Sequence, residues 1–191
     1  MYMLGINASP RIGGNTDILL DKALEGARLK GADTEKIILN QLKISPCQEC
    51  PDMPNESYCV IDDDMQAVYA KVKKCDILFF ASPIFFGSLS AQAKIMIDRF
   101  QCIWRAKYLF KNDAFMDKKR IGVFISVEAS ERRDFFDNAK EIVKNFFATI
   151  NTVYKKELFC PGVDEKAGIL KHPDYLNTAF ELGKKIASKG V

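Results

Sequence analysis

Short apolar runs alternate along the chain with segments whose apolar residues recur at helical spacing. The apolar runs predict strands over residues 2–8, 35–40, 76–82, 120–126 and 152–159. In the first helical segment, Leu20, Ala23, Leu24 and Ala27 lie on one face of a helix. The same periodicity predicts helices over residues 17–30, 63–74, 90–107, 134–150 and 173–188. Strands that alternate with helices predict an α/β protein with helices on both faces of a parallel sheet.

The strands differ in how apolar they are, and this difference predicts their order. Strands one, three and four are almost entirely apolar, as is usual for strands buried on both faces. Strand two is short and strand five carries Lys155, Lys156 and Glu157, so both are expected at the edges. This pattern fits the order 2-1-3-4-5 of the flavodoxin-like sheet. We therefore expect a single flavodoxin-like domain over residues 1–191, with a Cys-rich loop inserted at residues 41–62.

The composition excludes several other classes of protein. Hydrophobic residues make up 48% and charged residues 28%, which excludes disordered and collagen-like chains. The net charge is +3 without a concentrated basic stretch, so nucleic acid is not an expected partner. The longest apolar stretch, residues 77–87, is shorter than the ~20 residues that a membrane span needs. Six Cys are too few for a disulfide scaffold, and we expect a cytoplasmic location.

The loop after strand one is a candidate anion site. In an open parallel sheet, ligands bind beyond the carboxyl ends of the strands where the strand order reverses, here between strands one and three. Residues 9–16 read SPRIGGNT and lead into a helix. Backbone N–H groups at a helix N-terminus bind anions, and Arg11 adds a charged fork. A plain capped turn is the alternative interpretation. The glycine fingerprints of dinucleotide-binding and P-loop proteins are absent from the sequence.

The loop after strand three offers a flat apolar surface. Residues 82–90 read SPIFFGSLS, in which Pro83 fixes the backbone and Gly87 permits an unusual turn. Phe85 and Phe86 suit a planar ring that lies across the loop, although filling of the core is the alternative. Beside an anion site, this loop indicates a flat, phosphorylated cofactor.

These segments resemble the NADPH-dependent FMN reductase family and, within it, the iron–sulfur flavoproteins. The resemblance runs over essentially the whole chain and rests on residues 8–11, 14–16, 82–87, 90–94, 98–99, 162–166 and 181–183. It implies a flavodoxin-like fold, non-covalent FMN, two-electron chemistry from NAD(P)H or from another electron donor, and a homodimer or tetramer.

The resemblance also assigns the cofactor-binding residues. The phosphate of FMN would be held by Ser9, Arg11, Asn15 and Thr16. The ribityl chain and the ring would be held by Pro83, Ile84, Phe85, Phe86 and Gly87. The ring would be approached by Ser126, Val127 and Glu128. The family often has glycines at this last place, and Glu128 would bring negative charge close to the ring. No catalytic side chain is expected, because the flavin itself carries the electrons.

The Cys-rich loop contains Cys47, Cys50 and Cys59. The iron–sulfur flavoproteins that it resembles carry a C-x-x-C-x-x-C motif and a fourth Cys, and Met53 stands at the third Cys position of this chain. Clusters of this type are held by four thiolates, so we expect no ordinary 4Fe–4S cluster. The alternatives are a cluster with one labile iron, a zinc ion, free thiols, or a disulfide between Cys47 and Cys59.

The favoured function is an FMN-dependent oxidoreductase that accepts electrons from NAD(P)H. The alternatives are an electron-transfer protein with little nicotinamide activity and a regulatory protein without flavin. The aromatic segment 100–110, which contains Trp104, predicts an interface between subunits, with a buried helix end as the alternative. Quinones, free flavins, nitro or azo compounds and proteins are all open as electron acceptors.

Overall fold

The computed structural model describes residues 1–50, 58–112, 115 and 117–188. Its parallel strands form one twisted sheet in the order β2-β1-β3-β5-β6. Their bounds are β1 (Tyr2–Asn7), β2 (Asp33–Ile38), β3 (Ile77–Phe85), β5 (Arg120–Val127) and β6 (Thr152–Cys160). When the parallel strands alone are numbered along the chain, this is the order 2-1-3-4-5. The flavodoxin-like fold predicted from the apolar pattern is therefore confirmed.

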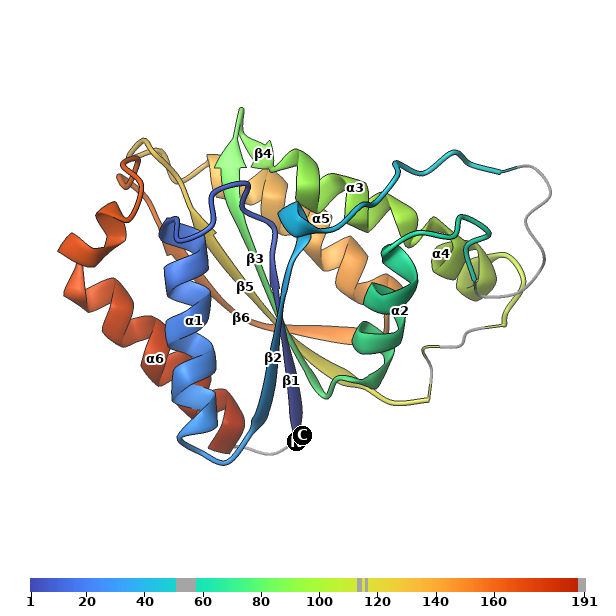
Figure 1. Ribbon diagram of the computed structural model, residues 1–191, viewed down its shortest axis with the longest axis horizontal. Coiled ribbons are helices and arrows are strands. Elements are labelled where there is room, and N and C mark those ends of the chain that lie inside the picture. The colour runs from blue at the N-terminus through green and yellow to red at the C-terminus, as the bar shows by residue number, and fades with distance from the viewer. Residues whose placement is uncertain (51–57, 113–114, 116, 189–191) are drawn as a thin grey trace.

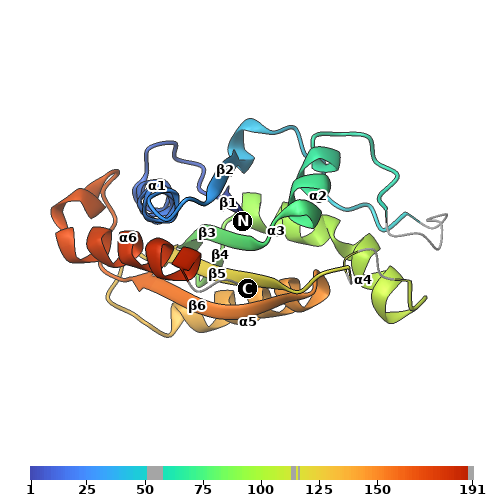
Figure 2. The ribbon, with the colours of Figure 1, turned by 90° about the horizontal axis from the view of Figure 1, so that it is seen from below.

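Helices cover both faces of the sheet, as Figures 1 and 2 show. One face carries α1 (Asn15–Arg28) and α6 (Pro173–Ser188). The other carries α2 (Met65–Lys74), α3 (Ala91–Arg99), α4 (Gln101–Tyr108) and α5 (Phe135–Thr149). Two short 3-10 helices, η1 (Leu39–Gln41) and η2 (Gly168–Lys171), lie in connections of the described chain. Successive residues of the central strands face opposite layers, so Phe79 packs with α1 and α6 whereas Phe80 packs with the other helices.

The backbones of α1 and α6 are in direct contact. A Cβ atom on Gly26 would lie 2.0 Å from the carbonyl oxygen of Phe180, and one on Gly183 would lie 1.8 Å from that of Ala23. Both positions therefore require glycine, because any side chain would force the helices apart. The contact fixes α6 against the helix that begins at the loop after β1.

The expected helix over residues 90–107 is wrong in one respect, because it is broken at Phe100 into α3 and α4. The Tyr69 hydroxyl donates a hydrogen bond to the carbonyl oxygen of Arg99, just before the break. The Phe100 ring is buried and packs against Tyr69 and Phe146, with ring centroids 5.0 Å apart in both pairs. Tertiary contacts of one aromatic residue thus override local helix propensity.

The predicted loop after strand three is instead a β-hairpin. Strand β3 continues past Ser82 to Phe85 and pairs antiparallel with β4 (Ser88–Leu89). The turn consists of Phe86 and Gly87, whose φ angles are 50° and 69°. Positive φ at both positions is typical of two-residue hairpin turns, whose backbone twist matches that of the flanking strands. Pro83 is tolerated within β3 although it has no backbone N–H to donate. It pairs with Val127, the last residue of β5, so it lies where the hydrogen bonds between these two strands end. The hairpin projects beyond the rest of the sheet at the top of Figure 1.

Among the described residues, no helix is long and apolar enough to span a membrane.

Candidate cofactor-binding site

A cavity of about 140 Å³ lies at the carboxyl ends of β1, β3 and β5. Its wall combines segments that are far apart in the sequence. The β1–α1 loop contributes Ser9, Arg11, Gly14, Asn15 and Thr16. The strand ends contribute Pro83, Ile84, Phe85, Val127 and Ala129. The segment after β6 contributes Val163, Asp164 and Lys166. The cavity therefore lies at the strand-order reversal where the sequence predicts a ligand.

The β1–α1 loop is folded by its own short hydrogen bonds. The N–H of Gly14 donates to the carbonyl of Arg11 at 3.0 Å, and the N–H of Arg11 donates to Ser9 Oγ at 3.1 Å. Gly14 occupies the N-cap of α1 and supplies no side-chain acceptor. Within the described chain, the N–H groups of Asn15, Thr16 and Asp17 have no hydrogen-bond partner. Such open donors at a helix N-terminus, with Arg11 nearby, suit an anion.

The side chain of Asn15 is occupied by other parts of the protein. Its Nδ2 donates to the carbonyls of Val163 and Glu165 at 3.3 and 2.9 Å. Its Oδ1 accepts a hydrogen bond from the N–H of Ile169 at 3.1 Å. Asn15 thus holds residues 163–169 against the start of α1, and its backbone N–H is the group left open to a ligand. Arg11 Nη1 makes a weaker contact of the same kind with the carbonyl of Asp164, at 3.3 Å.

Buried serines join the strand ends below the cavity. Ser126 Oγ donates to the carbonyl of Ser82 at 2.7 Å, which links β5 to β3. Ser90 Oγ donates to the carbonyl of Ala8 at 2.6 Å and accepts from the N–H of Ala93 at 3.2 Å. The second serine thereby caps α3 and ties it to the end of β1. These bonds join β1, β3, β5 and α3 at the edge of the sheet that carries the cavity.

Most of the predicted site residues line the cavity, but Phe86, Gly87, Ser126 and Glu128 lie outside its wall. Phe86 stands at the hairpin tip with its ring fully exposed. The carbonyl of Gly87 accepts a hydrogen bond from Asn138 Nδ2 at 3.0 Å, which ties the hairpin to α5. Glu128 is buried, and one of its carboxylate oxygens accepts from Ser130 Oγ at 2.6 Å.

The segment 163–169 is the part of the wall that sequence reasoning missed. Residues 162–166 are similar to the FMN reductase family, and that similarity was the available signal. Nothing in their local pattern connects them with the β1–α1 loop. Asn15 and Glu165, which are hydrogen-bonded, are 150 residues apart in the sequence.

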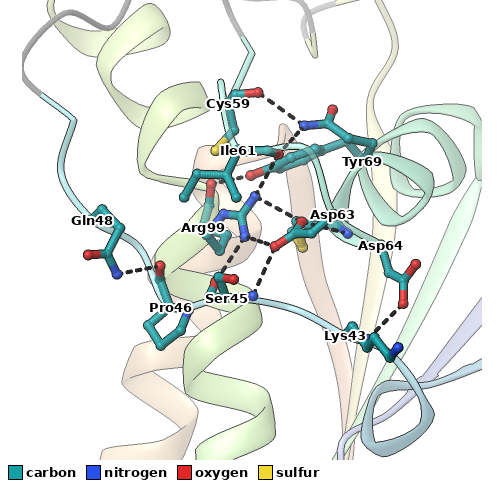
Figure 3. A network of polar contacts seen from close by, with 12 residues as sticks. Lys43, Ser45, Pro46, Gln48, Cys59, Ile61, Asp63, Asp64, Tyr69 and Arg99 are labelled. Carbon is teal, nitrogen blue, oxygen red and sulfur yellow. Dashed lines mark hydrogen bonds and ion pairs between the residues drawn. The ribbon is translucent and has the colours of Figure 1, made fainter.

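Both ends of the Cys-rich loop converge on Arg99, as Figure 3 shows. The guanidinium is buried, and Nη1 donates to the carbonyl of Ser45 at 2.9 Å and to Asp63 Oδ2 at 2.6 Å. Nη2 donates to Asp63 Oδ1 at 3.1 Å and, at 3.4 Å, to the carbonyl of Ile61. The N–H of Ser45 also donates to Asp63 Oδ2 at 2.9 Å. We call Arg99 and its partners Ser45, Ile61 and Asp63 the Arg99 clamp.

The contacts of the Arg99 clamp favour the ionised form of Asp63. Burial alone would raise the pKa of Asp63, but hydrogen bonds from Arg99 and from the N–H groups of Ser45 and Met65 outweigh it. The pKa of Asp63 therefore falls below its ordinary value of 3.8. Nearby, burial raises the pKa of the Cys102 thiol to about 11, so that thiol is neutral at physiological pH.

The Cys residues do not assemble into a metal site in the described part of the chain. No group of three His, Cys, Asp or Glu side chains there is placed to hold a metal ion. Cys47 and Cys50 are partly exposed, whereas Cys59 is buried, and its carbonyl accepts from Gln66 Nε2 at 3.0 Å. Met53 lies outside the described residues. By sequence this loop contains three Cys, one fewer than the four thiolates that hold an ordinary 4Fe–4S cluster.

The sheet order defines a flavodoxin-like α/β protein, with a cavity at the point where the strand order reverses. Residues 1–154 match the NADPH-dependent FMN reductase family, and the chain belongs to this family. It is 31% identical over 194 residues to an iron-sulfur flavoprotein of Methanocaldococcus jannaschii, covering 98% of this chain and 96% of that protein. An iron-sulfur flavoprotein of Methanosarcina thermophila is 32% identical over 130 residues, which cover 68% of this chain and 64% of that relative.

Solved structures show the same fold at lower identity. A flavone reductase has a TM-score of 0.74 at 22% identity, over 98% of this chain and 62% of its own. An NAD(P)H:quinone oxidoreductase from Methanothermobacter marburgensis has a TM-score of 0.71 at 16% identity, over 100% and 96% of the two chains. An FMN-dependent NADH-azoreductase from Bacillus anthracis, solved with FMN, has a TM-score of 0.72 at 12% identity, over 98% and 100%.

Proposed function

We propose that this protein is an FMN-dependent oxidoreductase that takes two electrons from NAD(P)H and passes them through bound FMN to an acceptor. The observation that carries the proposal is the two-sided chemistry of the cavity. One side presents open N–H groups of α1 and the Arg11 guanidinium, and the other presents the apolar wall of Pro83, Ile84 and Phe85. A phosphate suits the first side and a flat ring suits the second.

The residues of the cavity have distinct roles in this proposal. The backbone N–H groups of Asn15 and Thr16, with Ser9 and Arg11, bind the phosphate, while Asn15 also holds the segment 163–169 in place. Bound FMN supplies the hydride chemistry. Since the cavity is smaller than the ~300–1,000 Å³ of common ligand pockets, it encloses part of FMN and leaves the rest accessible to donor and acceptor.

Anaerobic spectroscopy tests the proposal. The purified protein should bind FMN in preference to FAD, and NADH or NADPH should bleach the flavin absorbance rapidly. The double variant Arg11→Ala, Asn15→Ala should bind FMN more weakly. Loss of the Arg11 guanidinium removes a charge-assisted hydrogen bond that contributes roughly 1.5–3 kcal/mol, and loss of the Asn15 amide releases the segment 163–169. Rapid bleaching by neither nucleotide would favour an electron-transfer protein, and a protein that binds no flavin would favour a regulatory role.

We also propose that the chain lacks an ordinary 4Fe–4S cluster and that FMN alone carries its electrons. The support is Met53 at the third Cys position and the Arg99 clamp, which joins both ends of the loop through protein groups. Iron and acid-labile sulfide should be absent after anaerobic purification, and Met53→Cys should introduce them. About four irons per wild-type chain would contradict this proposal.

We further propose a homodimer or tetramer. The exposed fractions of Trp104, Tyr108, Leu109 and Phe110 are 38%, 50%, 57% and 38%. Trp104 and Tyr108 border a groove of about 320 Å³ that Ile142 and Phe146 of α5 also line. Aromatic side chains of this kind are enriched at interface anchors. Trp104→Glu should dissociate the assembly in light scattering, and a wild-type monomer at micromolar concentration would contradict the proposal.

A further inference from the structure

Asp17 is a buried carboxylate in the first turn of α1, one residue after Thr16 of the cavity wall. Its Oδ2 accepts a hydrogen bond from the N–H of Gly13 at 2.8 Å, and its Oδ1 accepts one from Lys36 Nζ at 2.8 Å. Gly13 has a φ of 68°, so Asp17 holds a loop position that favours glycine. Asp17 therefore shapes the loop that presents the open N–H groups.

Lys36 reaches Asp17 from the edge strand β2. Successive residues of this strand point to opposite faces, so Glu35 pairs with Lys71 of α2 while Lys36 pairs with α1. Lys36 Nζ also lies 2.6 Å from Asp21 Oδ1. Burial lowers the pKa of Lys36, but its hydrogen bonds to Asp17 and Asp21 outweigh this effect and raise the pKa above 10.5. Lys36 therefore stays positively charged beside Asp17 at physiological pH.

A buried carboxylate next to a phosphate site is unfavourable for binding, because the two negative charges repel each other. The helix dipole favours an acidic residue in the first turn, but the same residue repels an anion that binds to that turn. Repulsion between two charges is strong where water is excluded. The contact with Lys36 offsets the negative charge of Asp17 while the hydrogen bond to Gly13 stays intact.

We propose that Lys36 is a positioning residue that sets the affinity for the flavin phosphate by neutralising Asp17, an inference that rests on the proposed FMN function. Lys36 acts through Asp17, which in turn holds Gly13. If the ion pair only stabilised the fold, its loss would weaken FMN and riboflavin equally, because riboflavin differs from FMN by its missing phosphate. The phosphate-dependent part of the affinity therefore separates the two roles.

The experiment measures dissociation constants for FMN and riboflavin by quenching of flavin fluorescence. Lys36→Met should weaken FMN about tenfold, the size expected for one uncompensated charge near the phosphate, and riboflavin less than about twofold. Lys36→Arg keeps the charge and should restore FMN binding. The double variant Asp17→Asn, Lys36→Met removes both charges and should also recover FMN affinity. Lys22→Met is the matched control, because Lys22 lies on α1 but pairs with Glu25 at the surface.

Three results would overturn the inference. The first is an equal loss of FMN and riboflavin affinity in Lys36→Met, and the second is no loss of either. The third is a double variant that binds FMN as weakly as Lys36→Met does. A wild-type protein that binds neither flavin would overturn the proposed function and this inference with it. A wild-type protein that prefers FMN, with an unaffected Lys36→Met variant, would overturn the inference alone.

Discussion

The loops after β1 and β2 leave neighbouring strands at the same edge of the sheet, yet the protein holds them in opposite ways. The first loop is short, and its own hydrogen bonds leave the N–H groups of Asn15, Thr16 and Asp17 open within the described chain. The second loop is long, and both of its ends bind the buried guanidinium of Arg99. Donors that the protein leaves open are available to a ligand, whereas donors that it satisfies itself hold the fold together.

This difference separates binding from stability. Breaking a buried ion pair by removing one partner leaves an uncompensated charge, which is costly for the fold. Loosening a ligand loop leaves the core intact and costs affinity for the ligand. Variants in the loop after β1 should therefore lower FMN affinity, whereas variants in the loop after β2 should lower the free energy of unfolding.

The largest effect is expected for Asp63→Ala. The free energy of unfolding should fall by about 3–5 kcal/mol, because the buried charge of Arg99 loses its partner. Chemical denaturation measures this change, and FMN affinity of the folded protein should stay near that of the wild type. Lys94→Ala, which breaks an exposed pair with Asp98, is the control and should cost less than about 1 kcal/mol. Equal losses in both variants would contradict a special role for the Arg99 clamp.

A smaller effect, on binding, is expected for Asn15→Ala. Its amide makes three hydrogen bonds to the segment 163–169, and each neutral bond contributes about 0.5–1.5 kcal/mol. FMN affinity should fall at least about tenfold as this wall of the cavity loosens, which titration calorimetry can measure. Thermal unfolding should change less than it does in Asp63→Ala. An Asn15→Ala variant with normal FMN affinity would show that the cavity does not depend on this tether.

The pH dependence of stability sharpens the same contrast. The folded pKa of Asp63 lies below its ordinary value of 3.8, so its stabilising contribution is complete above that value. The contribution is lost as the pH falls through the folded pKa. Wild type should therefore be more stable than Asp63→Asn at neutral pH, and the gap should close in acid. Denaturation curves recorded from pH 7 to pH 3 measure the gap, and a constant difference would refute the charge-based explanation.

The smallest effect, an increase in stability, is expected for Phe86→Asn. Phe86 has a φ of 50° in a two-residue hairpin turn, where Asn is preferred and a bulky residue is strained. The substitution also removes a fully exposed aromatic ring. The free energy of unfolding should rise by about 0.5–1 kcal/mol, measured by chemical denaturation. A loss of stability would mean that the Phe86 ring makes contacts in the assembled protein.

The sequence predicts the features that depend on local pattern. Apolar runs mark the strands and their order, and that order locates the candidate site. The break at Phe100 could not be predicted, because its cause is packing against Tyr69 and Phe146. The β3–β4 hairpin was missed because Phe86-Gly87 lacks the usual Asn-Gly signal. Arg99 carries a family motif, but its role as a clamp appears only when residues 45 and 63 are brought together in space.

The contacts of α1 have a consequence for the order in which the protein matures. During synthesis, α1 and the β1–α1 loop emerge early, but Asn15 binds residues 163–169 and Gly26 packs on Phe180. The wall of the cavity is therefore complete only after residues 163–169 have been made, and α1 gains its packing partner only with α6. Contacts between residues so distant in sequence slow folding, because the ends of a long loop must first meet. We therefore expect FMN to enter after translation, and a ribosome-bound chain that stops before residue 160 should not retain it.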